Sequence, residues 1–182
     1  MRLPILFWCG AVLLGTLGCG GGSGGASRST TPATQLAYSS SVADSTAWRL
    51  ELDPASSATH LVLDLLAPTG TSGQGFTVVL GSDPGNAVWS KIDGTNYAVQ
   101  SLFSAPLVNL ASVSGGELRI VFGQAPGTTV SYGANPVVKV ALDLAAGATV
   151  GDVVLTASQG GNLGTSATPD QVTVSVGSLL AK

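Results

Sequence analysis

The sequence predicts an all-β protein: an antiparallel, jelly-roll-like β-sandwich that follows a cleaved signal peptide and a flexible linker. Three observations predict this fold class. Apolar and polar side chains alternate with a period of two in several short segments, which is the pattern of a strand with one buried face. Turn sequences rich in Gly, Pro, Asn and Asp recur about every ten residues between these segments. Only residues 98–103 suggest a helical turn, and no internal repeat of useful length is present.

The predicted strands are of two kinds. Segments that alternate between apolar and polar residues should have one buried and one solvent-exposed face, and they are residues 48–53, 117–120, 138–144 and 171–176. More continuously apolar segments suit strands inside a sheet, and they are residues 60–66 and 75–80. Further β segments are expected at residues 87–91 and 151–157. Turns are expected between the strands, among them residues 83–86, 114–116 and 160–162.

The first residues of the chain have the pattern of a bacterial lipoprotein signal. Arg2 precedes an uncharged apolar stretch, residues 3–17, which is too short to cross a bilayer. Residues 14–19 resemble the bacterial lipobox, with Thr16 where leucine is commonest. The resemblance implies that residues 1–18 are removed and that Cys19 becomes the first residue of the mature chain and carries the lipid, palmitate included. The alternative is ordinary secretory cleavage nearby, which would leave Cys19 as a free thiol.

The residues after Cys19 predict where the protein is held. In similar lipoproteins an acidic residue at the next position marks retention in the inner membrane, and Gly20 stands there instead. We therefore expect a lipid anchor in the outer membrane of a Gram-negative cell, with the protein facing the periplasm or the surface. Residues 19–35 are rich in Gly and Ser and hold no apolar cluster, which predicts a flexible tether. The folded domain is then expected at residues 36–182.

Charge and cysteine content restrict the possible functions. The chain has 7 basic and 10 acidic residues and a net charge of −3, and loss of the leader, with Arg2, makes it −4. Charges this sparse argue against binding of nucleic acid. Cys9 lies in the leader, so a lipidated Cys19 leaves no thiol for a disulfide or a zinc site.

No catalytic residues are predicted. The single histidine, His60, has Ser56, Ser57 and Asp64 nearby in the sequence, but residues on one strand point to alternating faces, and the nucleophile motif Gly-x-Ser-x-Gly is absent. No pair of acidic residues is nominated for glycoside hydrolysis either. We therefore expect a protein that is not an enzyme.

Loop oxygens offer one candidate cation site. Asp83, Asn86 and Asp93 lie in predicted turns, and calcium prefers several oxygen ligands of this kind. No spacing resembles a helix-loop-helix calcium loop. The alternative at residues 83–86 is a plain turn, because Asp and Asn there cap their own backbone. Apart from calcium, no cofactor is expected.

Two aromatic residues are candidates for sugar binding. Trp89 and Tyr97 flank the turn at Asp93-Gly94 and could present an exposed aromatic pair on one face of a hairpin. Aromatic side chains are also favoured in strands for packing, so a place in the core is the alternative.

Several segments, taken in order, resemble the cohesin-like domains of bacterial extracellular proteins. Residues 75–84 match the strand pattern Gly-Phe-x-x-x-Leu-x-x-Asp-Pro, and residues 116–120 resemble the strand Gly-x-Leu-x-Ile. Residues 138–155 resemble the penultimate strand, its Gly-rich turn and the strand after it. The likeness spans residues 48–179 and implies a jelly-roll binding module without catalytic activity, related in fold to carbohydrate-binding modules.

These observations lead to one expected function and two alternatives. We expect a lipoprotein whose cohesin-like β-sandwich binds another envelope or extracellular protein. The first alternative is a module that binds polysaccharide from the same lipid anchor. The second is a structural accessory of a secretion or pilus system.

Overall fold

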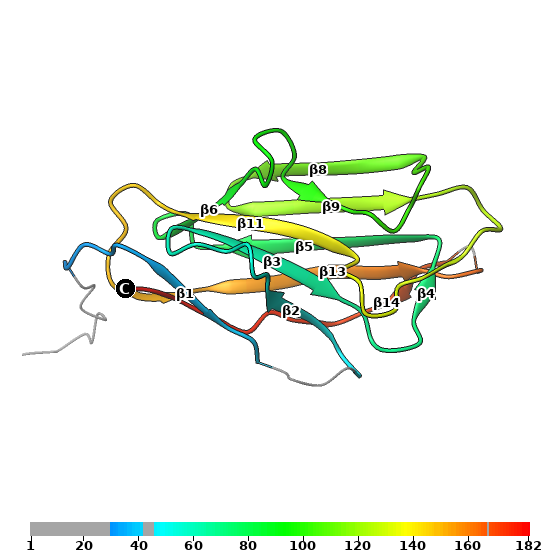
Figure 1. Cartoon of the computed structure of the whole chain (residues 1–182), viewed down its shortest axis with the longest axis horizontal. Helices are drawn as coiled ribbons and strands as arrows, with labels where there is room; N and C mark the ends of the chain where they lie inside the picture. Colours follow the sequence, from blue (N-terminus) through cyan, green and yellow to red (C-terminus); the bar gives the residue numbers. More distant parts are fainter. Residues whose placement is uncertain (1–29, 42–45, 167) are drawn as a thin grey trace, which may run out of the picture.

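The structure is a computed structural model that describes residues 30–41, 46–166 and 168–182. The predicted signal peptide, the lipidation site at Cys19 and most of the predicted linker lie outside the described residues. Every regular element in the described ranges is a β-strand. Within those ranges no helix is long and apolar enough to span a bilayer. Figure 1 shows most of the long strands running along the long axis of the molecule.

The first of two main sheets has six strands. Their order is β15-β2-β3-β11-β6, with β7 also paired to β11. The strands are β2 (Trp48–Leu52), β3 (His60–Leu66), β6 (Ala87–Ser90), β7 (Ala98–Val99), β11 (Val138–Leu144) and β15 (Val174–Ser175). All pairs are antiparallel except β15 with β2. The strands predicted at 60–66 and 138–144 are confirmed at the same bounds.

The second main sheet has five antiparallel strands in the order β14-β13-β5-β9-β8. They are β5 (Gly75–Ser82), β8 (Val108–Ser114), β9 (Glu117–Gly123), β13 (Leu155–Leu163) and β14 (Asp170–Gln171). Strands β8 and β9 form a hairpin around Gly115 and Gly116. Both glycines have positive φ, 59° and 85°, and a two-residue hairpin turn that follows the strand twist requires this conformation. The turn predicted at 114–116 is confirmed.

Two small sheets complete the sandwich. One has the order β1-β16-β12, formed by β1 (Leu36–Ser39), β12 (Gly151–Val153) and β16 (Ser178–Ala181). The other pairs β4 (Ser72–Gly73) with β10 (Val130–Ser131). The chain leaves β12 at Val153 and enters β13 at Leu155, so the segment predicted as one strand at 151–157 contributes to two different sheets.

The apolar faces of the two main sheets pack against each other. Trp48 of β2 stacks on Phe76 of β5 with ring centroids 4.8 Å apart, and the edge of Tyr132 lies 6.0 Å from Trp48. The Tyr132 hydroxyl is buried and donates a hydrogen bond to Asn162 Oδ1 at 2.8 Å. Leu63 of β3 and Ile120 of β9 are fully buried in the same core. The predicted all-β sandwich is therefore confirmed, and the Trp48 side chain belongs to its core.

The predicted boundary between linker and domain is a few residues too late. The backbone N–H groups of Thr34 and Gln35 both donate to the Lys182 carbonyl, and that of Ala33 donates to the Ala148 carbonyl at 2.8 Å. Pro32 forms an isolated bridge with Thr149. Local composition suggested a spacer here, but these polar backbone groups pair with parts of the chain that are distant in sequence.

Three local predictions were wrong. Residues 98–103 form no helical turn, because Ala98–Val99 pair with β11 instead. The turn predicted at 160–162 lies inside β13, where a bulge between Ser158 and Gly161 absorbs the extra residues and Gln159 takes a φ of 51°. The strand predicted at 171–176 is divided, since its ends join β14 and β15 in different main sheets.

Candidate functional site

The outer faces of the two main sheets differ in charge. The six-stranded sheet carries ion pairs across its outer surface. Arg49 Nε lies 2.5 Å from Glu51 Oε1 on β2, and His60 Nδ1 lies 2.5 Å from Asp143 Oδ1 across β3 and β11. Lys139 of β11 adds a third group of charges. This surface is polar, and most of its charges already have partners within the chain.

Lys139 holds two carboxylates on that face. Its ammonium group contacts Asp53 Oδ2 and lies 3.1 Å from Asp64 Oδ1. The hydrogen bond from Lys139 and another from the Ala55 backbone hold the pKa of Asp53 below its usual range. Burial raises the pKa of Asp64, and Asp64 Oδ1 accepts no well-aligned hydrogen bond from the described residues. Asp53 is therefore the strongly held partner and Asp64 the poorly satisfied one.

His60 does not form a catalytic relay with the residues considered from the sequence. Ser56 Oγ donates to the Val62 carbonyl, and Asp64 belongs to the Lys139 group. Asp143 Oδ1 and, at 3.5 Å, Ser90 Oγ both approach the same ring nitrogen of His60. A Ser-His-Asp relay needs the hydroxyl and the carboxylate on opposite nitrogens, so this arrangement does not supply one.

The outer face of the five-stranded sheet is almost uncharged. On its four longer strands, β13, β5, β9 and β8, the charged residues are Glu117 and Arg119 of β9. These two form an exposed ion pair of 2.9 Å with each other. The register places Val121 between Thr77 of β5 and Leu110 of β8 on the same face. This face therefore has no unpaired charge on those strands.

Apolar side chains are exposed at one side of this face. On this face Leu110 of β8 is 54% exposed and Val108 45%, and Val121 of β9 beside them is 36% exposed. We call these three residues the β8–β9 apolar patch. Leu107, just before β8, is 72% exposed. Isolated exposed apolar residues are ordinary, but a contiguous group on an uncharged sheet face is typical of a surface that contacts another macromolecule.

A shallow hollow adjoins the patch on the same face. Its volume is about 120 Å³, and Val121 forms part of its wall. The lining residues are Gly75, Phe76, Thr77, Val121, Phe122, Gly161, Leu163 and Pro169. Gly75 and Gly161 lack side chains, which opens the surface between the flanking apolar groups. A protruding apolar side chain of a partner would fit such a hollow.

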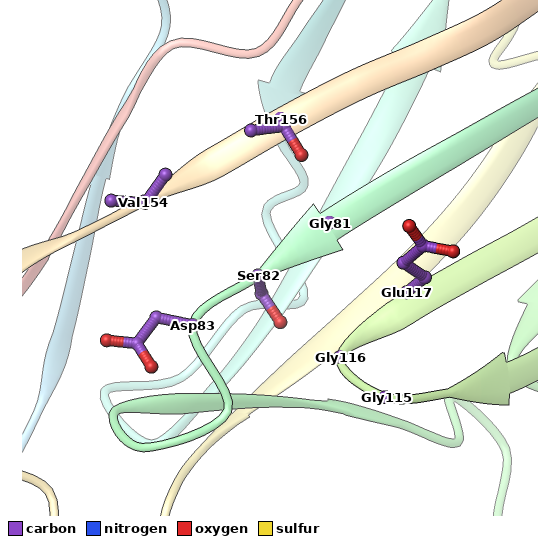
Figure 2. A pocket seen from close by; sticks show the side chains of 8 residues that line it. All are labelled: Gly81, Ser82, Asp83, Gly115, Gly116, Glu117, Val154 and Thr156. Carbon is purple, nitrogen blue, oxygen red and sulfur yellow. The ribbon is translucent and has the colours of Figure 1, made fainter.

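A second hollow, of about 210 Å³, lies at one end of the same sheet. Figure 2 shows the carboxylates of Asp83 and Glu117 on either side of Ser82. Gly81 has no side chain and lies between Thr156 and Glu117 of the neighbouring strands. The Gly116 carbonyl accepts a 2.9 Å hydrogen bond from Trp89 Nε1, which fixes the hairpin end beside this hollow. This end of the outer face therefore offers hydrogen-bond acceptors, whereas the end with the first hollow is apolar.

The aromatic pair expected from the sequence is not exposed. Trp89 is only 5% exposed, because its position on β6 turns the indole into the core. Tyr97 is half-buried and packs against the core, with the Lys91 ammonium 5.7 Å from its ring centroid. The prediction of an exposed Trp89–Tyr97 platform was therefore wrong, and the alternative of core packing applies to Trp89.

The side-chain oxygens considered for calcium accept hydrogen bonds from backbone N–H groups in this structure. Asp83 Oδ1 accepts the Gly85 N–H at 3.0 Å, and Asn86 Oδ1 accepts the Thr149 N–H at 2.9 Å. Hydrogen bonds from Asn96 and Thr95 lower the pKa of Asp93 to about 2. In the part of the chain that the structure describes, no three His, Cys, Asp or Glu residues gather in a way that could hold a metal ion. Calcium binding at Asp83, Asn86 and Asp93 stays a prediction.

The β8–β9 apolar patch was not predicted from the sequence. Strand β8, with the sequence VNLASVS, alternates only in part, because the apolar residues Leu110 and Ala111 are adjacent. Three of its four apolar residues have small or medium side chains, so their contrast with Ser and Asn is weak. Exposure of Val108 and Leu110 could not be inferred in any case, because alternation does not say which face is buried.

Comparison with known proteins identifies the fold. No protein-family model and no curated protein matches the chain. Among solved structures, the chain is similar to the sixth cohesin of scaffoldin B from Acetivibrio cellulolyticus, solved in complex with a mutant dockerin. The TM-score is 0.54 at 15% identity, over 72% of this chain and 99% of that one. The seventh type I cohesin of ScaB from Pseudobacteroides cellulosolvens matches with a TM-score of 0.48 at 11% identity, over 72% of this chain and 88% of that one.

The chain therefore has a cohesin-like β-sandwich, as the sequence resemblance implied. The matched part of this chain covers 99% of that cohesin domain. At 15% identity this likeness establishes the architecture and leaves the surface chemistry to be argued from the residues of this chain.

Proposed function

We propose that this protein is a non-catalytic lipoprotein of the cell envelope whose cohesin-like domain binds another protein. The binding surface is the outer face of the β13-β5-β9-β8 strands, centred on Val121. The observation that carries this proposal is the difference between the two sheets: one outer face is covered with ion pairs, and the other presents the β8–β9 apolar patch beside an apolar hollow.

The chemistry of this face favours a protein partner. An uncharged sheet face with exposed Leu and Val buries apolar area when a partner covers it, and its polar rim supplies hydrogen bonds. Polysaccharide recognition usually relies on exposed aromatic rings, and Trp89 does not supply one. The similar cohesin was solved with a dockerin bound, which supports a protein partner for this fold.

The proposed membrane anchor rests on the sequence. Cys19 would carry the lipid, and residues 20–31 would connect it to the first bridge of the domain at Pro32. A tether of this kind keeps the domain close to the membrane and raises the local concentration of an envelope partner. We place the protein in the outer membrane, facing the periplasm or the surface. Acylation of Cys19 is measured by mass spectrometry of the N-terminal peptide.

Affinity capture with a matched pair of variants tests the binding surface. Val121 on β9 and Val88 on β6 are both 36% exposed, but they lie on the outer faces of opposite sheets. We expect the tagged native chain to capture one specific protein from the organism's own envelope. The change Val121→Lys should abolish that capture, because a desolvated ammonium on the apolar face has no partner. The change Val88→Lys should leave it intact.

The same experiment separates the alternatives. Captured material is analysed for proteins and glycans, with and without a calcium chelator. Polysaccharide as the only captured species would contradict the proposal, as would a protein whose capture survives Val121→Lys and fails with Val88→Lys. Loss of capture in the chelator would implicate Asp83 and Asp93 in a calcium-dependent contact.

A further inference from the structure

Strand β8 is a long exposed edge of the five-stranded sheet. It pairs with β9 on one side, and on its other side it pairs with no strand among the described residues. Figure 1 shows β8 as the outermost strand of its sheet. Along such an edge every second residue directs its backbone N–H and C=O away from the sheet, where they are available to another strand.

Edge strands of natural proteins usually carry features that prevent pairing, and β8 lacks them. Its sequence contains no charged residue, no proline and no bulge. The other ends of the two main sheets are different: β14 and β15 have two residues each, and β6 has four and is followed by Lys91. A seven-residue, uncharged edge with exposed Val108 and Leu110 is therefore the part of the chain most suited to strand addition.

The side chains of β8 also fit a second copy of β8. Residues that face each other in an antiparallel pair have side chains on the same face of the sheet, so a two-fold axis must lie midway between one residue and its own copy. An axis at Leu110 places Leu110 against its own copy and Leu107 against Val113. It also sets Val108 against Ser112 and Asn109 against Ala111. No like charges meet in this register, although the chain as a whole carries a net charge of −3.

We propose that two copies of this chain associate through antiparallel pairing of their β8 strands around Leu110. The two five-stranded sheets then form one continuous sheet, and the row from Thr77 through Val121 to Leu110 continues into the same row of the partner copy. Because each copy uses the same edge, the pairing is closed and stops at the dimer. The proposal concerns the edge of the sheet and does not depend on the protein partner proposed for its face.

Charge substitution at the axis tests the dimer. The full chain is solubilised in a density-matched detergent, and its mass is measured by sedimentation equilibrium over a range of concentrations. The native chain should show a reversible monomer–dimer equilibrium. Leu110→Lys and Leu110→Glu should each raise the dissociation constant by about tenfold or more, because two like charges face each other across the axis. An equimolar mixture of the two variants should restore the dimer, since opposite charges then meet.

Restoration by the mixture excludes simple misfolding, because two misfolded variants would not repair each other. A cysteine at the axis gives a second measurement: Leu110→Cys should form a disulfide-linked dimer under mild oxidation, whereas Leu180→Cys, on exposed β16, should form no more than the native chain. A native chain that is monomeric at every concentration would overturn the proposal. A dimer unaffected by either charge at Leu110 would overturn it as well.

Discussion

Truncation of Phe76 to Ala is expected to lower the free energy of unfolding by about 3–5 kcal/mol. Phe76 is buried and stacks on Trp48, with ring centroids 4.8 Å apart. The two rings belong to opposite sheets, so removing one leaves a cavity at the contact that joins the sheets. Urea unfolding, followed by the fluorescence of the tryptophans, measures the loss.

A matched surface truncation provides the control for this prediction. Leu107 is 72% exposed, and Leu107→Ala should change the free energy of unfolding by less than about 0.5 kcal/mol. Equal losses from Phe76→Ala and Leu107→Ala would mean that the stacked aromatic pair is not part of the core, and the packing of the two sheets described above would be wrong.

Replacement of Lys139 by Met is expected to have the second largest effect on stability. Met keeps an unbranched apolar side chain but removes the charge that Asp53 and Asp64 share. Two partly buried carboxylates then face each other without a cation. Loss of one partner from a fully buried ion pair costs several kcal/mol, and the partial exposure of Lys139 reduces this to about 1–3 kcal/mol at pH 7.

The effect of Lys139→Met should depend on pH in a defined direction. In the native chain the pKa of Asp53 lies below its usual value of 3.8, so its contribution to stability is present above that pH and is lost on acidification. The pKa of Asp64 is raised, so its ionisation above pH 3.8 reduces stability. Without Lys139 both carboxyls resist ionisation, and the variant should regain stability as the pH falls toward 4. The difference from the native chain should therefore shrink between pH 7 and pH 4.

Substitutions of the two acids separate their roles. Asp53→Asn should destabilise the chain at pH 7, because Asp53 is the strongly held partner of Lys139. Asp64→Asn should be close to neutral, since it removes a carboxylate whose Oδ1 is buried without a well-aligned hydrogen bond. Urea midpoints at both pH values measure these differences. If the Lys139→Met loss grew on acidification, the assignment of the two carboxyls would be contradicted.

The fold was largely predictable because the alternation of apolar and polar residues can be read within each segment and arises from burial of one strand face in the core. Strands 60–66 and 138–144 were predicted at the bounds that the structure has, the first as a continuously apolar segment and the second from its alternation, and apolar residues of both pack in the core. The errors have non-local causes. Residues 160–162 look like a turn but are held in β13 by pairing with β14, and residues 32–35 look like a linker but are hydrogen-bonded to the chain near residues 148 and 182.

The candidate surface was less predictable than the fold. An alternating pattern shows that one face of a strand is buried, but it does not show whether the apolar residues left outside gather in one place. Leu110 and Val121 are 11 positions apart, and only the hairpin register brings them side by side. Trp89 shows the converse: its place beside a polar turn suggested exposure, whereas the register of β6 against β11 directs it inward.

We propose that the outer face of the five-stranded sheet binds a protein. The most direct measurement is the dissociation constant of the captured partner for the native chain, for Val121→Lys and for Val88→Lys, all in the same buffer. We predict that Val121→Lys weakens binding by about a hundredfold or more and that Val88→Lys changes it by less than about twofold. Equal affinity of all three chains, or weakening by Val88→Lys alone, would place the binding surface elsewhere and contradict the proposed function.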